Sequence, residues 1–221
     1  MTPAQQRRAL SPTVTWHPCR LPIRKNSVAG LKTSPSEEGA YADLCRRIRA
    51  GQEAALSELF EQASPALLRY ARGLTGREDF AQDAVQHAFI QVWKERGALR
   101  PDRSLKALLY TTVRHRALKQ MRNKNTRSEL ATENLDGSAT RPSPAETTDA
   151  GLLGTRIHDW IGELPERRRE AFRLSRFDQL SYREIAEVMD VSVRTVESHV
   201  RHALQHLRDR LETFEPERLS A

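Results

Sequence analysis

The chain has 221 residues, of which 38% are hydrophobic and 29% are charged, and its net charge is +7. These fractions are typical of a globular protein, and no apolar run approaches the roughly 20 residues of a membrane-spanning helix. We therefore expect no membrane insertion, and the absence of a continuous apolar stretch near the amino terminus favours a cytoplasmic location. The two cysteines, Cys19 and Cys45, have neither metal-ligand spacing nor a disulfide pattern.

The positive charge is concentrated in two stretches of the sequence. Residues 1–36 carry a net charge of +6 and residues 94–127 carry +9, whereas residues 37–93, 128–150 and 151–221 carry −3, −4 and −1. An internal basic block of this kind is either a solvated helix face or a surface that follows nucleic-acid phosphates. Charge alone leaves both interpretations open.

The composition divides the chain into two domains. Residues 1–40 contain five prolines and no helical periodicity, so we predict a disordered basic tail. Residues 128–151 are rich in Ser, Thr, Pro and acids and predict a flexible linker between domains at 41–127 and 152–214, with a short tail at 215–221. Neither domain shows alternating strand patterns. The predicted fold class is all-α, with two small helical domains.

The first domain contains three helical segments. Apolar residues recur at helical spacing over 55–74, where Ser64-Pro65 predicts either a helical pair or one kinked helix. An amphipathic segment over 78–96 has a polar face rich in amides. Ser104 is a plausible N-cap for the third helix, whose polar side carries the basic block.

The second domain ends in a pattern typical of a helix-turn-helix. Ser181 and Glu184 form a capping-box sequence, and Ser192 can cap a following helix with apolar residues at spacings of three and four. The second helix of such a motif lies in the major groove of DNA. Its outward side presents the candidate base- and phosphate-contacting residues Arg194, Thr195, Glu197, Ser198, His199, Arg201 and His202. The alternative is an ordinary amphipathic hairpin with a solvated face.

These patterns together resemble the extracytoplasmic-function group of the sigma-70 family. Asp83-Ala84-Val85-Gln86 through Phe89 and Val92-Trp93 is similar to the family's D-x-V-Q-x-x-F-x-x-V-W signature in region 2.2. Residues 104–118 are similar to regions 2.3 and 2.4. Leu164-Pro165, residues 180–186 and residues 193–207 resemble region 4. The resemblance covers residues 42 to 213 approximately and implies a promoter-specificity subunit of RNA polymerase.

The resemblance also implies partners and site residues. Asp83, Gln86 and Phe89 are expected to dock on the clamp helices of the polymerase β′ subunit, while region 4 packs on the β flap and reads the minus-thirty-five element. The minus-ten element is assigned to the basic helix, with Tyr110, Arg114, His115, Arg116, Lys119 and Arg122. An anti-sigma factor is a further expected partner. Leu108, His115 and His87 depart from the residues common in relatives, which affects minus-ten preference and the β′ contact.

Two other functions fit parts of the sequence. The helix-turn-helix also resembles output domains of LuxR-type regulators, but the amino-terminal half lacks the alternating strands of a receiver domain. A helical metal-dependent hydrolase would use His199, His202 and His206, yet no HExxH pattern or fourth ligand accompanies them. We therefore expect no catalytic residues, no metal site and no cofactor.

Overall fold

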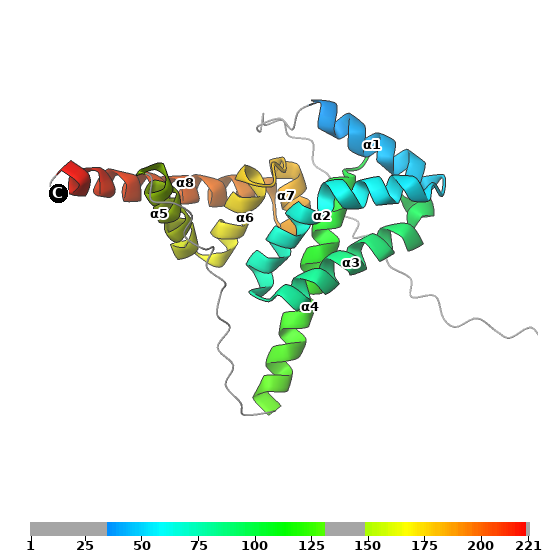
Figure 1. Ribbon diagram of the computed structural model, residues 1–221, viewed down its shortest axis with the longest axis horizontal. Helices are drawn as coiled ribbons and strands as arrows, with labels where there is room; N and C mark the ends of the chain where they lie inside the picture. Colours follow the sequence, from blue (N-terminus) through cyan, green and yellow to red (C-terminus); the bar gives the residue numbers. More distant parts are fainter. Residues whose placement is uncertain (1–34, 131–148, 220–221) are drawn as a thin grey trace, which may run out of the picture.

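The computed structural model describes residues 35–130 and 149–219, in which helices are joined by short turns and loops and no strand is present (Figure 1). None of the helices in these two ranges combines the length and the apolarity needed to cross a bilayer. The elements are α1 (Pro35–Arg49), α2 (Glu53–Thr75), α3 (Glu78–Lys94), the short 3₁₀ helix η1 (Arg96–Ala98), α4 (Leu105–Leu130), α5 (Asp149–Glu163), α6 (Glu166–Arg176), α7 (Tyr182–Met189) and α8 (Val193–Leu219).

Helices α1 to α4 form an amino-terminal unit around a leucine- and valine-rich core. Leu59, Leu67, Val85, Leu109 and Val113 are all buried there. Full burial of each such side chain contributes about 1.5–3 kcal/mol. The helical periodicity of the apolar residues places these side chains on the sides of the helices that face one another. The segment around Pro65 is one helix rather than a pair, and Figure 1 shows α2 changing direction along its length.

The start of α4 follows the sequence prediction. The Ser104 hydroxyl accepts a hydrogen bond from the Ala107 amide at 3.1 Å, as an N-cap should. From there α4 passes through the core of the amino-terminal unit, and its carboxy-terminal half extends beyond the other helices (Figure 1). The basic block therefore lies on a helix that is buried on one side near its start and projects at its end.

Helices α5 to α8 form a carboxy-terminal unit that contains the predicted helix-turn-helix. Ser181 and Glu184 make a complete capping box at the start of α7. Asp190 adopts a left-handed conformation with φ of 55°, which ends α7 and turns the chain toward α8. The Ser192 hydroxyl then accepts a hydrogen bond from the Thr195 amide at 3.1 Å. These polar side chains fix both ends of the turn.

The helix boundaries differ from the predicted domain limits by a few residues. Helix α1 begins at Pro35, within the predicted tail, because proline is well tolerated in the first turn of a helix. Helix α4 continues to Leu130 since neither Gly nor Pro interrupts it, and α8 continues to Leu219. The rest of the predicted tail and most of the predicted linker, residues 1–34 and 131–148, lie outside the described residues.

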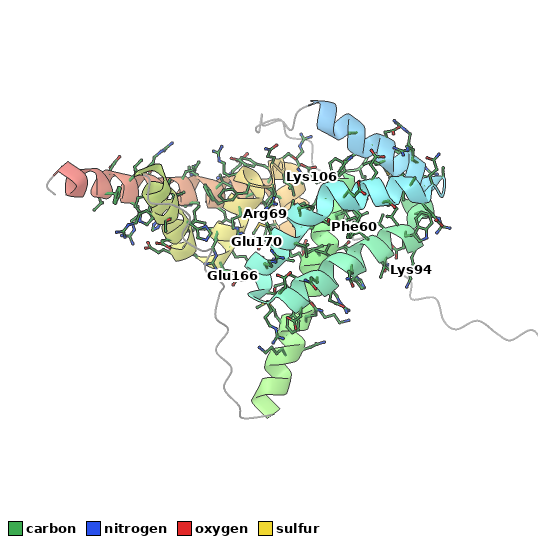
Figure 2. The ribbon with its side chains drawn as sticks, in the orientation of Figure 1. Phe60, Arg69, Lys94, Lys106, Glu166 and Glu170 are labelled. Carbon is green, nitrogen blue, oxygen red and sulfur yellow. The ribbon has the colours of Figure 1, made fainter. Side chains whose placement is uncertain are left out.

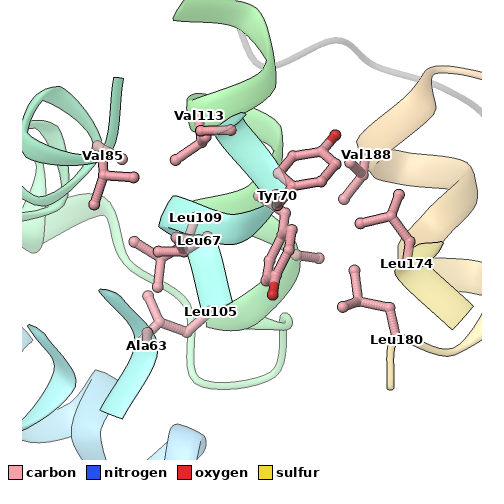
Figure 3. Close-up of a cluster of buried hydrophobic side chains, with 14 of the residues drawn as sticks. Ala63, Leu67, Tyr70, Val85, Leu105, Leu109, Val113, Leu174, Leu180 and Val188 are labelled. Carbon is pink, nitrogen blue, oxygen red and sulfur yellow. The ribbon is translucent and has the colours of Figure 1, made fainter. Parts of the chain in front are cut away.

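The two helical units predicted from the sequence are present, and buried residues of both belong to one hydrophobic cluster. Helix α7 packs against α4, and Leu174, Leu180 and Val188 from the carboxy-terminal unit face the side of α2 and α4 that carries Tyr70 and Leu105 (Figure 3). The sequence predicted each apolar face but not the element that covers it. A smaller cluster around Ile161, Leu164, Phe172 and Ala203 lies inside the carboxy-terminal unit.

The contribution of the capping box to the free energy of unfolding should be measurable. Ser181→Ala removes the N-cap of α7 and should lower the free energy of unfolding by about 1 kcal/mol in a chemical denaturation series. The matched control is Ser57→Ala, because the exposed Ser57 hydroxyl bonds only to the Glu53 carbonyl of its own helix. Equal denaturation midpoints for the two variants would show that the cap contributes nothing.

Candidate polymerase and nucleic-acid interfaces

The predicted polymerase-docking residues on α3 lie in three different environments. Gln86 is exposed, whereas Phe89 is buried and meets Phe60 of α2 edge to face, with ring centroids 4.9 Å apart. Asp83 is half-buried and accepts hydrogen bonds from Arg116 Nε at 2.8 Å and Gln120 Nε2 at 2.6 Å. Asp83 therefore braces α3 against α4, and its carboxylate already has two internal partners.

An apolar surface accompanies Gln86 on the outside of α2 and α3. Ile90 is 53% exposed and Phe60 is 46% exposed, which is unusual for such large side chains in a well-packed unit. Phe60 and Phe89 line a groove together with Leu56, Ser57 and Glu61. Figure 2 shows Phe60 between α2 and α3. Phe60 and Ile90 were not predicted as docking residues. Phe60 belongs to the apolar pattern predicted for α2, so the sequence pattern does not indicate its exposure, whereas Ile90 lies outside the predicted apolar face of α3, which was the available signal.

The basic face of α4 is accessible toward the helix end. His115, Lys119 and Arg122 are exposed. Arg116 is partly exposed and is held by Asp83. These four residues of the predicted minus-ten set therefore lie on the surface of α4, with Arg116 oriented by α3.

The other two predicted minus-ten residues are buried where the units meet. Arg114 donates through Nε to Glu170 Oε1 at 2.7 Å, and the two side chains are only 8% and 4% exposed. The Tyr70 hydroxyl donates to the same carboxylate oxygen at 2.8 Å. In this conformation α6 covers Arg114, and the DNA contact of Arg114 stays a prediction. Figure 2 places Glu170 on α6 where that helix approaches α2.

Tyr110 has a similar position on the same side of α4. It is 2% exposed, and its ring lies 5.1 Å from that of Tyr70. Burial raises the pKa of Tyr110 far above its usual range, and the nearby negative charge of Asp178 raises it further. Burial also raises the pKa of Asp178. Tyr110 is therefore a neutral side chain inside the contact between the units, and its DNA contact stays a prediction.

Sequence reasoning missed Glu170 and Asp178, the two buried acids of this contact. For Glu170 a signal existed, since it precedes Leu174 by four residues and so shares the apolar face of α6. A carboxylate at such a position needs a partner inside the fold. For Asp178, which lies after the helix, the sequence offers no comparable periodicity.

The seven predicted residues of the recognition helix all lie at the surface of α8. Arg194, Arg201 and His202 are exposed, and the remaining four are partly exposed. Thr195 is held by Ser192, with their hydroxyl oxygens 2.8 Å apart, and His202 Nδ1 lies 2.7 Å from the Ser198 carbonyl oxygen. Arg194 and Arg201 are consequently the two most accessible cations near the start of the helix.

A second basic element lies beside this helix. Burial lowers the pKa of His199, and the positive charges of Arg168 and Arg167 on α6 lower it further. These two arginines therefore lie close to α8, and they are not among the residues predicted to contact DNA. Because a neutral imidazole can both donate and accept hydrogen bonds, His199 can bond either a phosphate or a base edge.

The remaining histidines form no metal site within residues 39–124 and 154–214. His206 Nε2 lies 3.6 Å from Glu163 Oε2, and Arg210 pairs with the same carboxylate. In that part of the chain no group of three or more His, Cys, Asp or Glu side chains has the arrangement of a metal centre. Cys45 is buried and unpaired, and its burial raises the pKa of its thiol.

Comparison with known proteins agrees with this arrangement. Residues 59–127 match the family model described as Sigma-70 region 2, and residues 155–207 match the one described as Sigma-70, region 4. The ECF RNA polymerase sigma factor SigL of Mycobacterium tuberculosis is 26% identical over 160 residues, which are 72% of this chain and 90% of that protein. The ECF RNA polymerase sigma factor RpoE of Cereibacter sphaeroides is 25% identical over 181 residues, which are 81% of this chain and 99% of that protein.

A solved structure shares the fold. The sigma factor RpoE in complex with the anti-sigma factor NepR from Bartonella quintana has a TM-score of 0.58 and 23% identity, and the similarity covers 72% of this chain and 97% of that chain. The two family models together span more than half of the 221 residues, in the order region 2 and then region 4. The chain therefore belongs to the extracytoplasmic-function group of the sigma-70 family, and it is an RNA polymerase sigma factor for transcription initiation.

Proposed function

We propose that this chain binds core RNA polymerase through the outer surface of α2 and α3 and reads promoter DNA through α4 and α8. The single observation that carries the proposal is the helix-turn-helix of α7 and α8, with Arg194 and Arg201 exposed near the start of its second helix. The chain acts as an initiation factor without catalytic activity, in the cytoplasm, where RNA polymerase is located.

Core docking uses the apolar patch and its polar border. The exposed Phe60 and Ile90 supply apolar area, and Gln86 supplies hydrogen-bonding groups beside it. Asp83 contributes mainly by holding α3 against α4, because its carboxylate is occupied by Arg116 and Gln120. A partner surface with apolar residues fits this patch, and the β′ clamp helices are the partner that the family implies.

The minus-ten element is opened and held by α4. His115, Lys119 and Arg122 present cations and an aromatic ring along the exposed side of the helix, a combination that suits unpaired strands because phosphates are neutralised while bases stack. Arg116 joins them once DNA competes with Asp83. Tyr110 and Arg114 belong to the same surface when α6 and α7 do not cover it.

The minus-thirty-five element is read by α8 with help from α6. Residues 151–221 have a net charge of −1, so the carboxy-terminal unit has little general attraction for DNA. We infer that this unit binds DNA productively when polymerase holds it near the promoter through the β flap. An anti-sigma factor is a further proposed partner, since the sigma factor of similar fold was crystallised with one.

Reconstituted transcription tests the proposal. Purified chain added to core polymerase should direct initiation from a subset of a promoter library and should co-purify with the core enzyme. A LuxR-type regulator would bind DNA without forming a stable complex with core polymerase, so absence of the complex together with specific duplex binding would contradict the proposal.

The recognition helix can be tested residue by residue. If Arg194 or Arg201 contacts a base, its replacement by Ala should relax preference at one upstream position by about 1–3 kcal/mol, whereas loss of a phosphate contact should weaken all promoters alike. The measurement is initiation across the promoter library at several salt concentrations. Arg208→Ala, an exposed cation farther along α8, is the control. An unchanged level and sequence profile in Arg194→Ala, Glu197→Ala and Arg201→Ala would rule out this helix as the reader.

The docking patch gives a second prediction. Ile90→Asp places a charge in the apolar patch and should weaken core binding by roughly tenfold or more, while the half-exposed position keeps the stability change within about 0.5 kcal/mol. The control is Leu211→Asp, which alters an exposed apolar side chain on α8. Asp83→Ala is a less specific test because it also removes two internal hydrogen bonds. If Ile90→Asp bound core polymerase with the affinity of the parent chain, the apolar patch would not be the docking surface.

A further inference from the structure

A pocket of about 210 Å³ lies where α1, α2 and α4 meet the turn that follows α6. Tyr41, Tyr110 and Phe177 line it with aromatic rings, and Lys106 and Asp178 line it with opposite charges. The volume corresponds to about seven water molecules at roughly 30 Å³ each, which is less than the roughly 300 Å³ or more of sites for drug-sized ligands. The pocket therefore suits a ligand with one substituted ring.

The pocket contains a buried polar group without a partner. Tyr110 is 2% exposed, and its hydroxyl completes no hydrogen bond of normal geometry with the described residues, although Asp178 lies beside it. Burial and the negative charge of Asp178 both raise the pKa of Tyr110, so the hydroxyl keeps its proton and can donate it. The large majority of buried polar side-chain atoms in native proteins have a partner. This hydroxyl therefore indicates a place for a ligand atom that accepts a hydrogen bond.

Positive charge predominates around the pocket. Asp178 is 8% exposed, and burial raises the pKa of its carboxyl group, while the positive charges of Arg69, Arg173 and Lys106 oppose this shift. Three cations thus surround one carboxylate. Lys106 is half-buried and lines the pocket itself, so its ammonium group can pair with an anionic group of a ligand.

The walls leave room for a flat ring. Ala63 and Ala66 form the α2 side of the pocket, where their small side chains leave space. Phe177 is 56% exposed, so much of its ring is available for contact with another aromatic ring. Gln179 has a φ of 55°, a left-handed conformation that costs free energy for residues other than Gly. Strain of this kind persists where the local shape has a use, and here it shapes the turn that lines the pocket.

We propose that this pocket binds a small hydroxylated aromatic acid. A hydroxyl group on the ligand can accept a hydrogen bond from Tyr110 and donate one to Asp178, because hydroxyls do both. The ligand's carboxylate pairs with Lys106, and its ring packs against the aromatic walls. A phosphate or another compact anion would leave the aromatic walls without contact and would meet Asp178 with like charge. The inference goes beyond the proposed function, because neither polymerase nor DNA takes part in it.

Titration calorimetry of the purified full chain with the three isomers of hydroxybenzoate tests the proposal. At least one isomer should bind one-to-one with a dissociation constant below about 1 mM. Benzoate lacks the hydroxyl group and hydroxybenzyl alcohol lacks the carboxylate. Each should therefore bind at least about tenfold more weakly than the best isomer.

Two variants each remove one interaction with the ligand. Tyr110→Phe deletes only a hydroxyl that has no partner in the fold, so the chain should stay folded while the affinity for the best isomer falls about tenfold. Lys106→Met removes the cation but keeps an unbranched side chain, and it should lower the affinity by a similar factor. The matched control is Lys94→Met, which removes an exposed cation at the end of α3, outside the pocket, and should bind like the parent chain (Figure 2).

A third variant fills the pocket without changing a polar group. Ala66→Leu places a branched aliphatic side chain in its wall, and Leu is almost as favourable in a helix as Ala. Binding of the best isomer should be lost. The control is Ala54→Leu, at an exposed position of the same helix, which should bind like the parent chain. Nuclear Overhauser effects between the ring protons of the ligand and the Ala63 methyl group should place the ring in the pocket.

Two results would overturn the inference. One is failure of all three isomers to bind at millimolar concentration. The other is parent-like affinity in Tyr110→Phe, Lys106→Met and Ala66→Leu, with circular dichroism showing that each variant is folded, because binding would then occur elsewhere. A parent chain that failed to bind core polymerase would refute the proposed function, but it would not change the outcome of the calorimetry.

Discussion

The Glu170 carboxylate determines how the two helical units fit together. Apolar contacts such as those of Leu174 and Val188 tolerate small rotations, because burial energy has no direction. A carboxylate that must accept hydrogen bonds from both Tyr70 and Arg114 tolerates few such rotations, because losing either bond leaves a buried polar group unsatisfied. The apolar layer thus supplies attraction, and the hydrogen bonds to Glu170 select one orientation. The capping contact between Ser104 and Glu184 depends on that same orientation.

The sequence predicted those features whose causes are local. Ser104, the Ser181 and Glu184 pair, and Ser192 act within one helical turn, and their hydrogen bonds match the prediction. Packing between the units has no local cause. Helical periodicity shows that α4 and α6 each have an apolar face, but nothing in either segment says that the two segments share one core. The polar composition of 128–151 predicts a spacer between two units, and it carries no information on whether the units touch.

The same limit applies to the candidate site. His115, Lys119 and Arg122 could be predicted as exposed polar side chains because they lie outside the apolar stripe of α4. Arg114 has the same appearance in the sequence as these residues, yet it is buried against the carboxylate of Glu170, which lies on α6 and is 56 residues away in the chain. Asp83 is a similar case on α3. Its match to the family signature predicts a contact with polymerase, but the signature does not indicate that Arg116 and Gln120 donate hydrogen bonds to its carboxylate. A residue type indicates which interactions are available, and the fold decides which one is made.

The two units differ in charge, and therefore in their expected attraction for DNA. The carboxy-terminal unit is near neutral, so phosphate attraction alone gives it little hold on DNA. Residues 94–127, most of which belong to α4, carry +9 and supply the larger electrostatic contribution. Because one contact is weak and the other is unspecific, promoter selection depends on both being made together, and tethering through polymerase raises the effective concentration of the weaker one.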